Sequence, residues 1–168
     1  MHERKSREGT AVRTGAGNAS GSSILNQDGD LEYLSDDLPA VVAPIAAGRT
    51  GVVYGSRVLG PSTAKSAWSF YLGGKFLSWL TNTLYGSSIT DEPTCYKAFR
   101  TDLLRSIPLE CTGFEFCPEV TAKILKRGYP IQEVPIRYAP RSRREGKKIR
   151  WTDGMEAIWV LVKYRFTG

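Results

Sequence analysis

The chain has 168 residues, enough for one domain with a sizeable core, and 41% of them are hydrophobic. Its 23 Lys and Arg residues exceed its 17 Asp and Glu residues, and the net charge of +6 favours an anionic partner. The 3 cysteines lack C-x-x-C spacing and His2 is the only histidine, which disfavours a zinc site or a disulfide framework and favours free thiols in a reducing compartment.

Hydropathy along the chain disfavours a membrane-spanning or secreted protein. No segment approaches the roughly 18–20 consecutive apolar residues that cross a bilayer. The start, MHERKSREGT, lacks the apolar core of a signal peptide. We therefore expect a cytosolic chain, which can still lie on a membrane surface.

The first part of the chain predicts a strand–helix–strand unit. Residues 1–22 are polar and rich in Gly, Ser and Arg, as in a mobile tail. A short strand, a helix and a compact β-branched strand are then expected at residues 23–28, 35–47 and 51–57. This succession indicates an α/β fold in layers, with a parallel sheet.

The helix expected at 35–47 carries signals at both ends. Ser35 or Asp36 can cap its start, and Pro39 falls in the first turn, where a missing N–H is harmless. Gly48 can close the helix at its other end.

The rest of the chain alternates helical and extended patterns. Residues 64–85 predict an aromatic helix or helix pair with its break at Gly73-Gly74, and the apolar faces indicate core or membrane contact. Later, a strand is expected at 95–100 and a helix at 114–128, ended by Gly128. An alternating strand is expected at 131–138 and an amphipathic helix at 151–166, capped by Thr152 or Asp153.

Three acids stand at alternate positions directly after the first expected strand: Asp28, Asp30 and Glu32. An extended segment points alternate residues to one face, where carboxylates repel one another and raise one another's pKa. A hard divalent cation with oxygen ligands would relieve that repulsion. The alternative is a solvated acidic turn.

The positive charge gathers near the carboxyl end of the sequence. Residues 141–165 contain eight basic side chains and three acids, so this quarter supplies +5 of the net charge of +6. Gly146 lies amid these charges and favours a loop that bends around a bound group, although a solvated basic loop is the plainer interpretation.

Six sequence blocks, taken in order, resemble those of family-two GT-A glycosyltransferases: QDGDLEY, VVYGSR, ITDEPTCYKAFR, FEFCPEV, EVPIRYAPR and GKKIRWTDGMEAIW. They are most similar to the dolichyl- and polyprenyl-phosphate mannosyl- and glucosyltransferases, from about Gly9 to Phe166. The resemblance implies an α/β, Rossmann-like GT-A fold with a mostly parallel sheet and flanking helices. It makes residues 23–168 the later part of that domain and residues 9–21 a family helix within the polar segment 1–22.

The resemblance also implies roles for matched residues. Asp28 and Asp30 correspond to the D-x-D pair that holds Mg²⁺ or Mn²⁺ on the donor diphosphate, with Glu32 as a further ligand; Asp30 is also expected to act in catalysis. Asp91 matches a catalytic aspartate on the acceptor side. The expected phosphate-binding residues are Arg57, Arg141, Lys147 and Lys148.

The implied reaction is metal-dependent, inverting transfer of mannose or glucose from a GDP- or UDP-sugar to a polyprenyl or dolichyl phosphate, at the cytosolic face of a membrane. A lipid monophosphate has its second pKa near ~6 and is largely anionic at pH 7, so no strong base is needed. The alternative is a catalytically dead module that binds anionic lipid. Nucleic acid is the weakest candidate partner, because the basic residues are confined to one loop.

Several of these assignments compete with plainer ones. Arg57 can pair with a surface acid, and Asp91 can cap a turn. The family's first strand, with a P-x-Y-N-E-like turn that cradles base and ribose, has no match here. We therefore expect about two βα units to be absent, residues 23–28 to be an unpaired edge, and the 168-residue chain to bind sugar nucleotide weakly.

Overall fold

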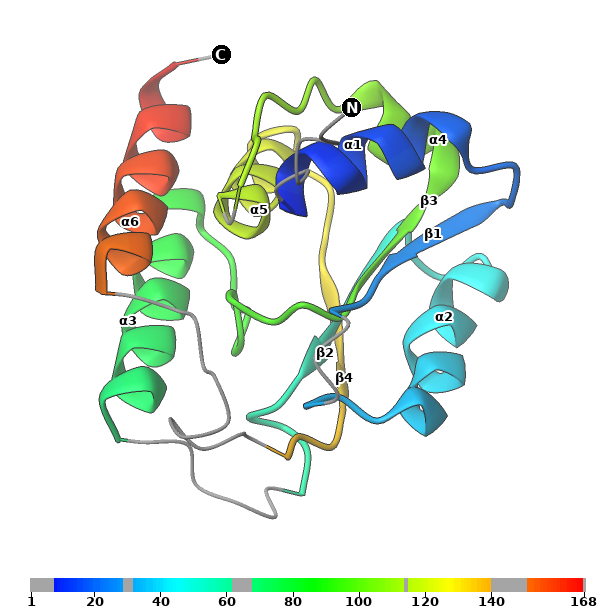
Figure 1. Cartoon of the computed structure of the whole chain (residues 1–168), viewed down its shortest axis with the longest axis horizontal. Helices are drawn as coiled ribbons and strands as arrows, with labels where there is room; N and C mark the ends of the chain where they lie inside the picture. Colours follow the sequence, from blue (N-terminus) through cyan, green and yellow to red (C-terminus); the bar gives the residue numbers. More distant parts are fainter. Residues whose placement is uncertain (1–7, 29–31, 62–67, 114, 140–150, 168) are drawn as a thin grey trace, which may run out of the picture.

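The computed structural model describes residues 8–28, 32–61, 68–113, 115–139 and 151–167. A central sheet lies between helix α2 (Leu38–Ala46) on one face and helices α1 (Glu8–Asn18), α4 (Thr101–Ser106) and α5 (Phe116–Lys126) on the other (Figure 1). Helices α3 (Trp68–Tyr85) and α6 (Trp151–Phe166) form a further layer outside α5. The layered α/β fold is therefore confirmed.

The described sheet has four strands in the order β1-β3-β2-β4, with bounds Ser23–Asn26 (β1), Val52–Ser56 (β2), Lys97–Arg100 (β3) and Gln132–Pro135 (β4). β2 and β4 pair in parallel, whereas β3 pairs antiparallel with both β1 and β2. Three strands thus run in one direction, as expected of a mostly parallel sheet, and β3 runs against them. β3 reverses because the segment before it crosses the carboxyl end of β2, so β3 begins there.

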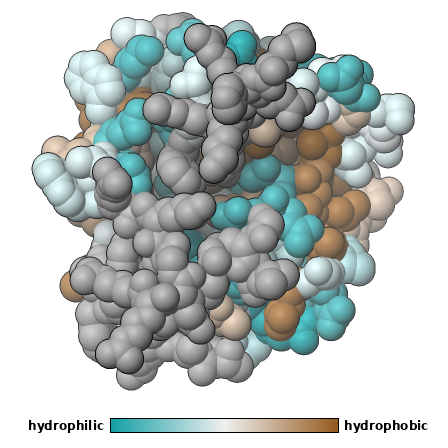
Figure 2. Space-filling view, in the orientation of Figure 1, coloured by the Kyte–Doolittle hydropathy of each residue, from teal (hydrophilic) through white to brown (hydrophobic). Residues whose placement is uncertain are grey.

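β1 lies at one edge of the described sheet, where β3 is its partner. This agrees with the edge expected at 23–28. Figure 2 shows hydrophobic residues gathered on the side of the molecule where β1 and α2 lie. The pairing of β1 with β3 runs from Ser23 opposite Arg100 to Asn26 opposite Lys97, so the strand delivers Asp28 just beyond the last pair.

Alternating side chains of the strands supply the two cores. Val52, Tyr54 and Phe99 pack with α1, α4 and α5 on one face, while Val53 and Ala98 pack with α2 on the other. This division follows from the period of two residues along a strand. Both faces of β2 are covered, which explains why all five of its residues are buried.

Glycines end two of the predicted helices as expected. Gly48 has φ +67° after α2, and Gly128 has φ +78° after α5. Glycine adopts this left-handed conformation without the steric penalty of a Cβ. Gly86, also at positive φ, follows α3 in the same way.

Several local expectations are wrong. α3 runs without a break through Gly73-Gly74, because packing of the surrounding turns overrides the weak helix propensity of glycine. Neither Ser35 nor Asp36 caps α2: a short 3₁₀ turn, Ser35–Asp37, comes first, and the carboxylate of Asp37 binds Arg137 instead.

Two further differences concern the helices near the chain ends. The polar segment 1–22 contains helix α1, as the family resemblance implied and the mobile-tail interpretation did not. α6 begins at Trp151, so Thr152 and Asp153 lie inside its first turn rather than at its cap. The short helix α4, which packs beside α1, was not predicted.

Candidate active site

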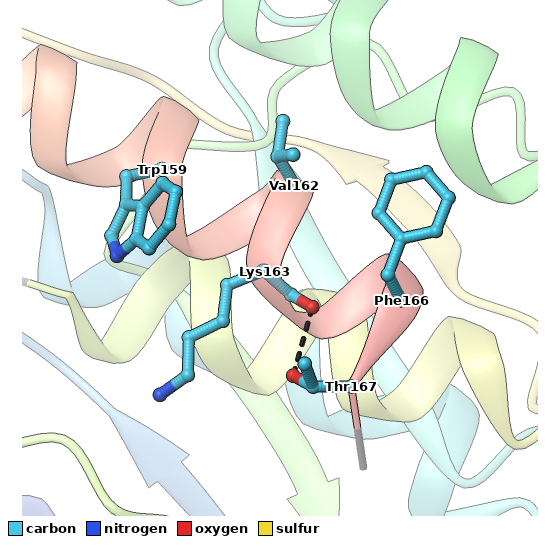
Figure 3. A pocket seen from close by; sticks show the side chains of 5 residues that line it. All are labelled: Trp159, Val162, Lys163, Phe166 and Thr167. Carbon is cyan, nitrogen blue, oxygen red and sulfur yellow. Dashed lines mark hydrogen bonds between the residues drawn. The ribbon is translucent and has the colours of Figure 1, made fainter.

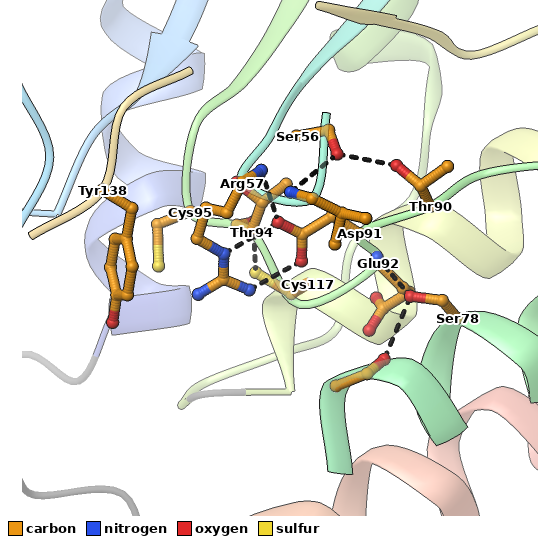
Figure 4. A network of polar contacts seen from close by, with 12 residues as sticks. Ser56, Arg57, Ser78, Thr90, Asp91, Glu92, Thr94, Cys95, Cys117 and Tyr138 are labelled. Carbon is orange, nitrogen blue, oxygen red and sulfur yellow. Dashed lines mark hydrogen bonds and ion pairs between the residues drawn. The ribbon is translucent and has the colours of Figure 1, made fainter. Parts of the chain in front are cut away.

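The carboxyl end of β2 holds an arginine–aspartate pair (Figure 4). The Asp91 carboxylate accepts hydrogen bonds from Nε and Nη2 of Arg57, each at 2.7 Å, and from the backbone N–H of Arg57 at 2.9 Å. Asp91 is only 4% exposed and the Arg57 side chain 23%. The structure therefore joins two of the predicted site residues, and the acid that pairs with Arg57 is buried rather than on the surface.

The geometry of this pair leaves part of the guanidinium available. Asp91 occupies the Nε and Nη2 edge, and Nη1 of Arg57 makes no hydrogen bond within the described part of the chain. An arginine fork can bind two anions on different edges. Asp91 thus fixes the direction of Arg57, and Nη1 has no hydrogen-bond partner among the described residues.

Electrostatics keep Asp91 ionised. Its burial raises the pKa of the carboxyl group, but the charge of Arg57 and the hydrogen bonds from it lower the pKa by more, so that the pKa lies below its ordinary value. A carboxylate in this state is a poor proton acceptor at neutral pH. The contacts of Asp91 suit an orienting role better than a general base.

The acidic half of the site begins just after β1. Asp28 is half-buried, and the thiol of Cys95 lies 3.8 Å from its Oδ2. Glu32 is 5% exposed, and its Oε2 accepts a short hydrogen bond from the hydroxyl of Tyr138. Asp30, the other acid of the predicted metal site, lies outside the described residues.

Tyr138 links the two halves of the site. Its ring lies 5.1 Å from the guanidinium carbon of Arg57, a cation–π contact, and its hydroxyl donates to Glu32. Tyr33 packs against the Tyr138 ring with centroids 5.3 Å apart and accepts a hydrogen bond from the backbone N–H of Cys95. One tyrosine therefore contacts a basic predicted residue with its ring and an acidic one with its hydroxyl, a role that sequence reasoning missed.

Two buried ionisable residues lie next to the site in the chain or on the neighbouring strand, Glu92 directly after Asp91 and Lys97 on β3. Lys97 and Glu92 are both inaccessible to solvent. The ammonium of Lys97 donates to the backbone carbonyl of Glu92 at 2.6 Å and lies 3.8 Å from the Tyr54 ring centroid. Burial raises the pKa of Glu92, and the charge of Lys97 offsets this only in part. Sequence reasoning missed both residues, because Lys and Glu are seldom fully buried.

Two of the three acids expected to hold a metal lie within the described residues. Asp28 and Glu32 offer hard carboxylate oxygens, which suit Mg²⁺ or Mn²⁺. Within the described ranges no three His, Cys, Asp or Glu side chains gather as a ligand group. Glu32 is buried and its carboxylate accepts the hydroxyl of Tyr138, so its contacts suit a structural role beside the metal ligands better than direct metal binding. A metal at this point would therefore depend on Asp28 and Asp30 together.

The predicted phosphate contacts Arg141, Lys147 and Lys148 lie outside the described residues. A hollow of about 560 Å³ lies instead along α6, lined by Trp159, Val162, Lys163, Phe166 and Thr167 (Figure 3). None of these residues belongs to the Arg57–Asp91 site. The described helices include none that is both long and apolar enough to cross a membrane.

The family model that matches this chain is Glycosyl transferase family 2, over residues 1–107. The chain belongs to this family. The family-2 chain is 30% identical over 132 residues to the undecaprenyl-phosphate mannosyltransferase of Micrococcus luteus, covering 74% of itself and 52% of that protein. It is 31% identical over 142 residues to the UDP-N-acetylglucosamine–dolichyl-phosphate N-acetylglucosaminyltransferase of Methanococcus voltae, covering 81% of itself and 57% of that protein.

Among solved structures, the family-2 chain resembles glucosyl-3-phosphoglycerate synthase from Mycobacterium tuberculosis, crystallised with Mn²⁺, UDP-glucose and phosphoglyceric acid. The TM-score is 0.70 at 16% identity, with 97% of this chain and 56% of that chain covered. This similarity confirms the GT-A fold. The chain spans a little over half the length of these relatives.

Proposed function

We propose that this chain forms the metal and acceptor side of a glycosyltransferase that moves mannose or glucose, with inversion, from a GDP- or UDP-sugar to a polyprenyl or dolichyl phosphate. The observation that carries this proposal is the position of Tyr138 between Arg57 and Glu32. A cationic site beside an acidic one suits a reaction between two phosphate-bearing substrates. The relatives named for undecaprenyl- and dolichyl-phosphate support the acceptor class.

The donor would bind at the acidic half. Asp28 and Asp30 would hold Mg²⁺ or Mn²⁺, with Glu32 fixed behind them by Tyr138. When bound, the cation would supply positive charge to the departing diphosphate. The Mn²⁺ and UDP-glucose in the glucosyl-3-phosphoglycerate synthase structure support this assignment of donor and metal.

The acceptor phosphate would bind Nη1 of Arg57, the guanidinium nitrogen that Asp91 does not bind. Above its second pKa of ~6 a phosphate monoester carries nearly two charges and is itself a nucleophile, so it needs positioning rather than deprotonation. Asp91 would then orient Arg57 rather than remove a proton, in keeping with its lowered pKa. Arg141 and Lys147 or Lys148 stay predicted as further phosphate contacts.

An apolar outer face on α3 and α6 supports a membrane location. The two helices pack together through Leu80, Leu161 and neighbouring apolar residues. Large apolar side chains at helical spacing point outward on both helices, with exposed fractions from 45% to 81%: Tyr71, Leu72, Phe76, Trp79, Trp151, Met155, Trp159 and Phe166. We call these eight residues the outer apolar face.

The charges beside the outer apolar face favour an anionic bilayer as its partner. Lys75 lies on α3, which has no acid, and Lys163 and Arg165 lie in the last turn of α6, at the other end of that helix from its acids Asp153 and Glu156. Aromatic residues flanked by Lys and Arg are typical of helices that lie in a membrane interface. The final helix packs on α5 and α3 on its inner side, so its outer side is available for this contact.

Replacing Phe76 and Trp159 together by Ser is expected to weaken binding of the chain to vesicles of anionic lipid by about tenfold to a hundredfold. Full burial of an aromatic side chain is worth about 1.5–3 kcal/mol, and only the exposed part of each, about half, would be newly buried in lipid. Vesicle sedimentation measures the change. Tyr129→Ser is the control, since Tyr129 is an exposed aromatic residue outside both helices. Equal binding by the wild type and the double variant would remove the outer apolar face from the membrane assignment.

Sugar transfer tests the proposed function. Two proteins are assayed: the 168-residue chain, and the same chain with the first βα units of a family-2 relative joined to its start. We term the second protein the extended chain. With Mn²⁺ and labelled GDP-mannose or UDP-glucose, the extended chain is expected to label polyprenyl phosphate and not polyprenol. If the extended chain transferred sugar from neither donor, the proposal would be overturned. Vesicle binding that does not change with donor or metal would then identify a lipid-binding module.

A further inference from the structure

We infer that Glu133 is a positioning residue for the arginine that faces the acceptor phosphate. Glu133 lies on β4, opposite Tyr54 of β2. Its Oε2 accepts the backbone N–H of Thr90 at 2.8 Å, and its Oε1 accepts the backbone N–H of Asp91 at 3.0 Å. Because Asp91 in turn binds Arg57, the carboxylate of Glu133 fixes the direction of the guanidinium without touching it.

The segment that carries Asp91 depends on side chains for its conformation. Residues 86–96 form no helix or strand, so the hydrogen bonds of these backbone groups must come from elsewhere. Ser56 of β2 bonds the Thr90 hydroxyl at 2.6 Å, and the N–H of Glu92 donates to the Ser78 hydroxyl of α3 at 2.9 Å. Of the side chains of Ser56, Ser78 and Glu133, that of Glu133 is the one that accepts the backbone N–H of Asp91.

A carboxylate is the side chain that this geometry requires. Two consecutive N–H groups point at Glu133, and only a carboxylate offers an acceptor oxygen to each. Glutamine has almost the same shape but offers one oxygen and one NH₂ group. Glu133→Gln therefore breaks one hydrogen bond and places two donors against each other, with little change in packing.

The chain contains a matched control for this substitution. Glu119 on α5 also binds two consecutive backbone N–H groups, those of Glu110 and Cys111, both at 2.7 Å. Glu119 is 1% exposed and also binds Lys123. Its contacts do not lead to Arg57, whereas those of Glu133 lead to Arg57 through Asp91. Glu119→Gln breaks the same kind of contact in a different loop. If loosening any loop disturbed Arg57, both variants would change its exchange equally, and if the Glu133 contacts had no bearing on Arg57, Glu133→Gln would leave its exchange unchanged.

The 168-residue chain is labelled with ¹⁵N, and solvent exchange of the Arg57 Nε–H proton is measured by NMR. Glu133→Gln is expected to speed this exchange by about three- to tenfold, the effect of losing about one hydrogen bond, whereas Glu119→Gln leaves it unchanged. Glu133→Asp, whose shorter side chain can reach only one of the two N–H groups, should fall between. Unchanged exchange in Glu133→Gln would overturn the inference, as would an equal increase in Glu119→Gln.

The same samples are titrated with geranyl phosphate, a soluble prenyl monophosphate, by calorimetry. The significance of Glu133 for phosphate binding rests on the proposed function, and Glu133→Gln is expected to weaken geranyl phosphate binding by a similar factor of about three to ten. Faster Arg57 exchange in Glu133→Gln without geranyl phosphate binding by the wild type would support the positioning role and contradict the proposed acceptor. Weaker geranyl phosphate binding with unchanged Arg57 exchange would contradict the positioning role and support the acceptor.

Discussion

Replacing Asp91 by Asn is expected to lower the free energy of unfolding by about 3 kcal/mol, because it leaves the largely buried charge of Arg57 without a counter-charge. Asn retains one acceptor oxygen for the three N–H groups of Arg57 that Asp91 binds. This loss lies at the low end of the range for a buried pair, since the Arg57 side chain is 23% exposed. Urea unfolding at pH 7 measures the change.

Asp102→Asn is the control for this substitution. Asp102 forms an ion pair with Arg100 at 2.5 Å, and both side chains are exposed. Exposed pairs contribute little to stability, so the midpoint of unfolding should not move. Equal losses of stability in the two variants would show that burial of the Arg57–Asp91 pair has no energetic consequence.

The stability contributed by Asp91 should depend on pH in a defined direction. Its pKa in the folded chain lies below the ordinary value of 3.8. A lowered folded-state pKa gives stability that is fully present above the unfolded-state pKa and is lost as the pH falls through the folded-state pKa. The difference between wild type and Asp91→Asn should therefore be constant from pH 7 to about pH 5 and shrink below pH 3.8. A difference at pH 3 as large as at pH 7 would contradict this account.

Much of the fold follows from local signals in the sequence. The buried strand at 52–56 and the helix ends at Gly48 and Gly128 are confirmed, because β-branched runs and glycine conformation are local properties. The direction of β3 and the continuity of α3 through Gly73-Gly74 depend on packing between distant segments. Single-residue propensities carry no information on such contacts.

The candidate site shows the same division. Asp28, Glu32, Arg57 and Asp91 were singled out from spacing and family blocks, yet the pairing of Arg57 with Asp91 joins residues 34 positions apart. Their supports were not predicted. Tyr138 lies in a pattern typical of an ordinary strand, as does Glu133, and only the assembled sheet shows what each one binds.

Replacing Asp30 by Asn in the extended chain is expected to lower the rate of sugar transfer by about a hundredfold to a thousandfold, the usual effect of removing one group that stabilises charge in a transition state. The loss of one of two ligands should also weaken Mn²⁺ binding. Asp36→Asn is the control, because Asp36 is an exposed carboxylate six residues further along the chain, in the 3₁₀ turn before α2, and its ion pair with Arg137 is long, at 3.7 Å. Its transfer rate should equal that of the wild type.

Whether the acidic residues form a metal site for sugar transfer is decided by the initial rate of label transfer from the nucleotide sugar to polyprenyl phosphate. This rate is measured against Mn²⁺ concentration for wild type and Asp30→Asn. The wild-type extended chain should show a rate that rises with Mn²⁺ and disappears in chelator. Asp30→Asn should stay at least a hundredfold slower at every Mn²⁺ concentration, in the range given above. A wild-type rate that persists in chelator, or an Asp30→Asn rate equal to that of the wild type, would contradict the account of the acidic residues as a metal site.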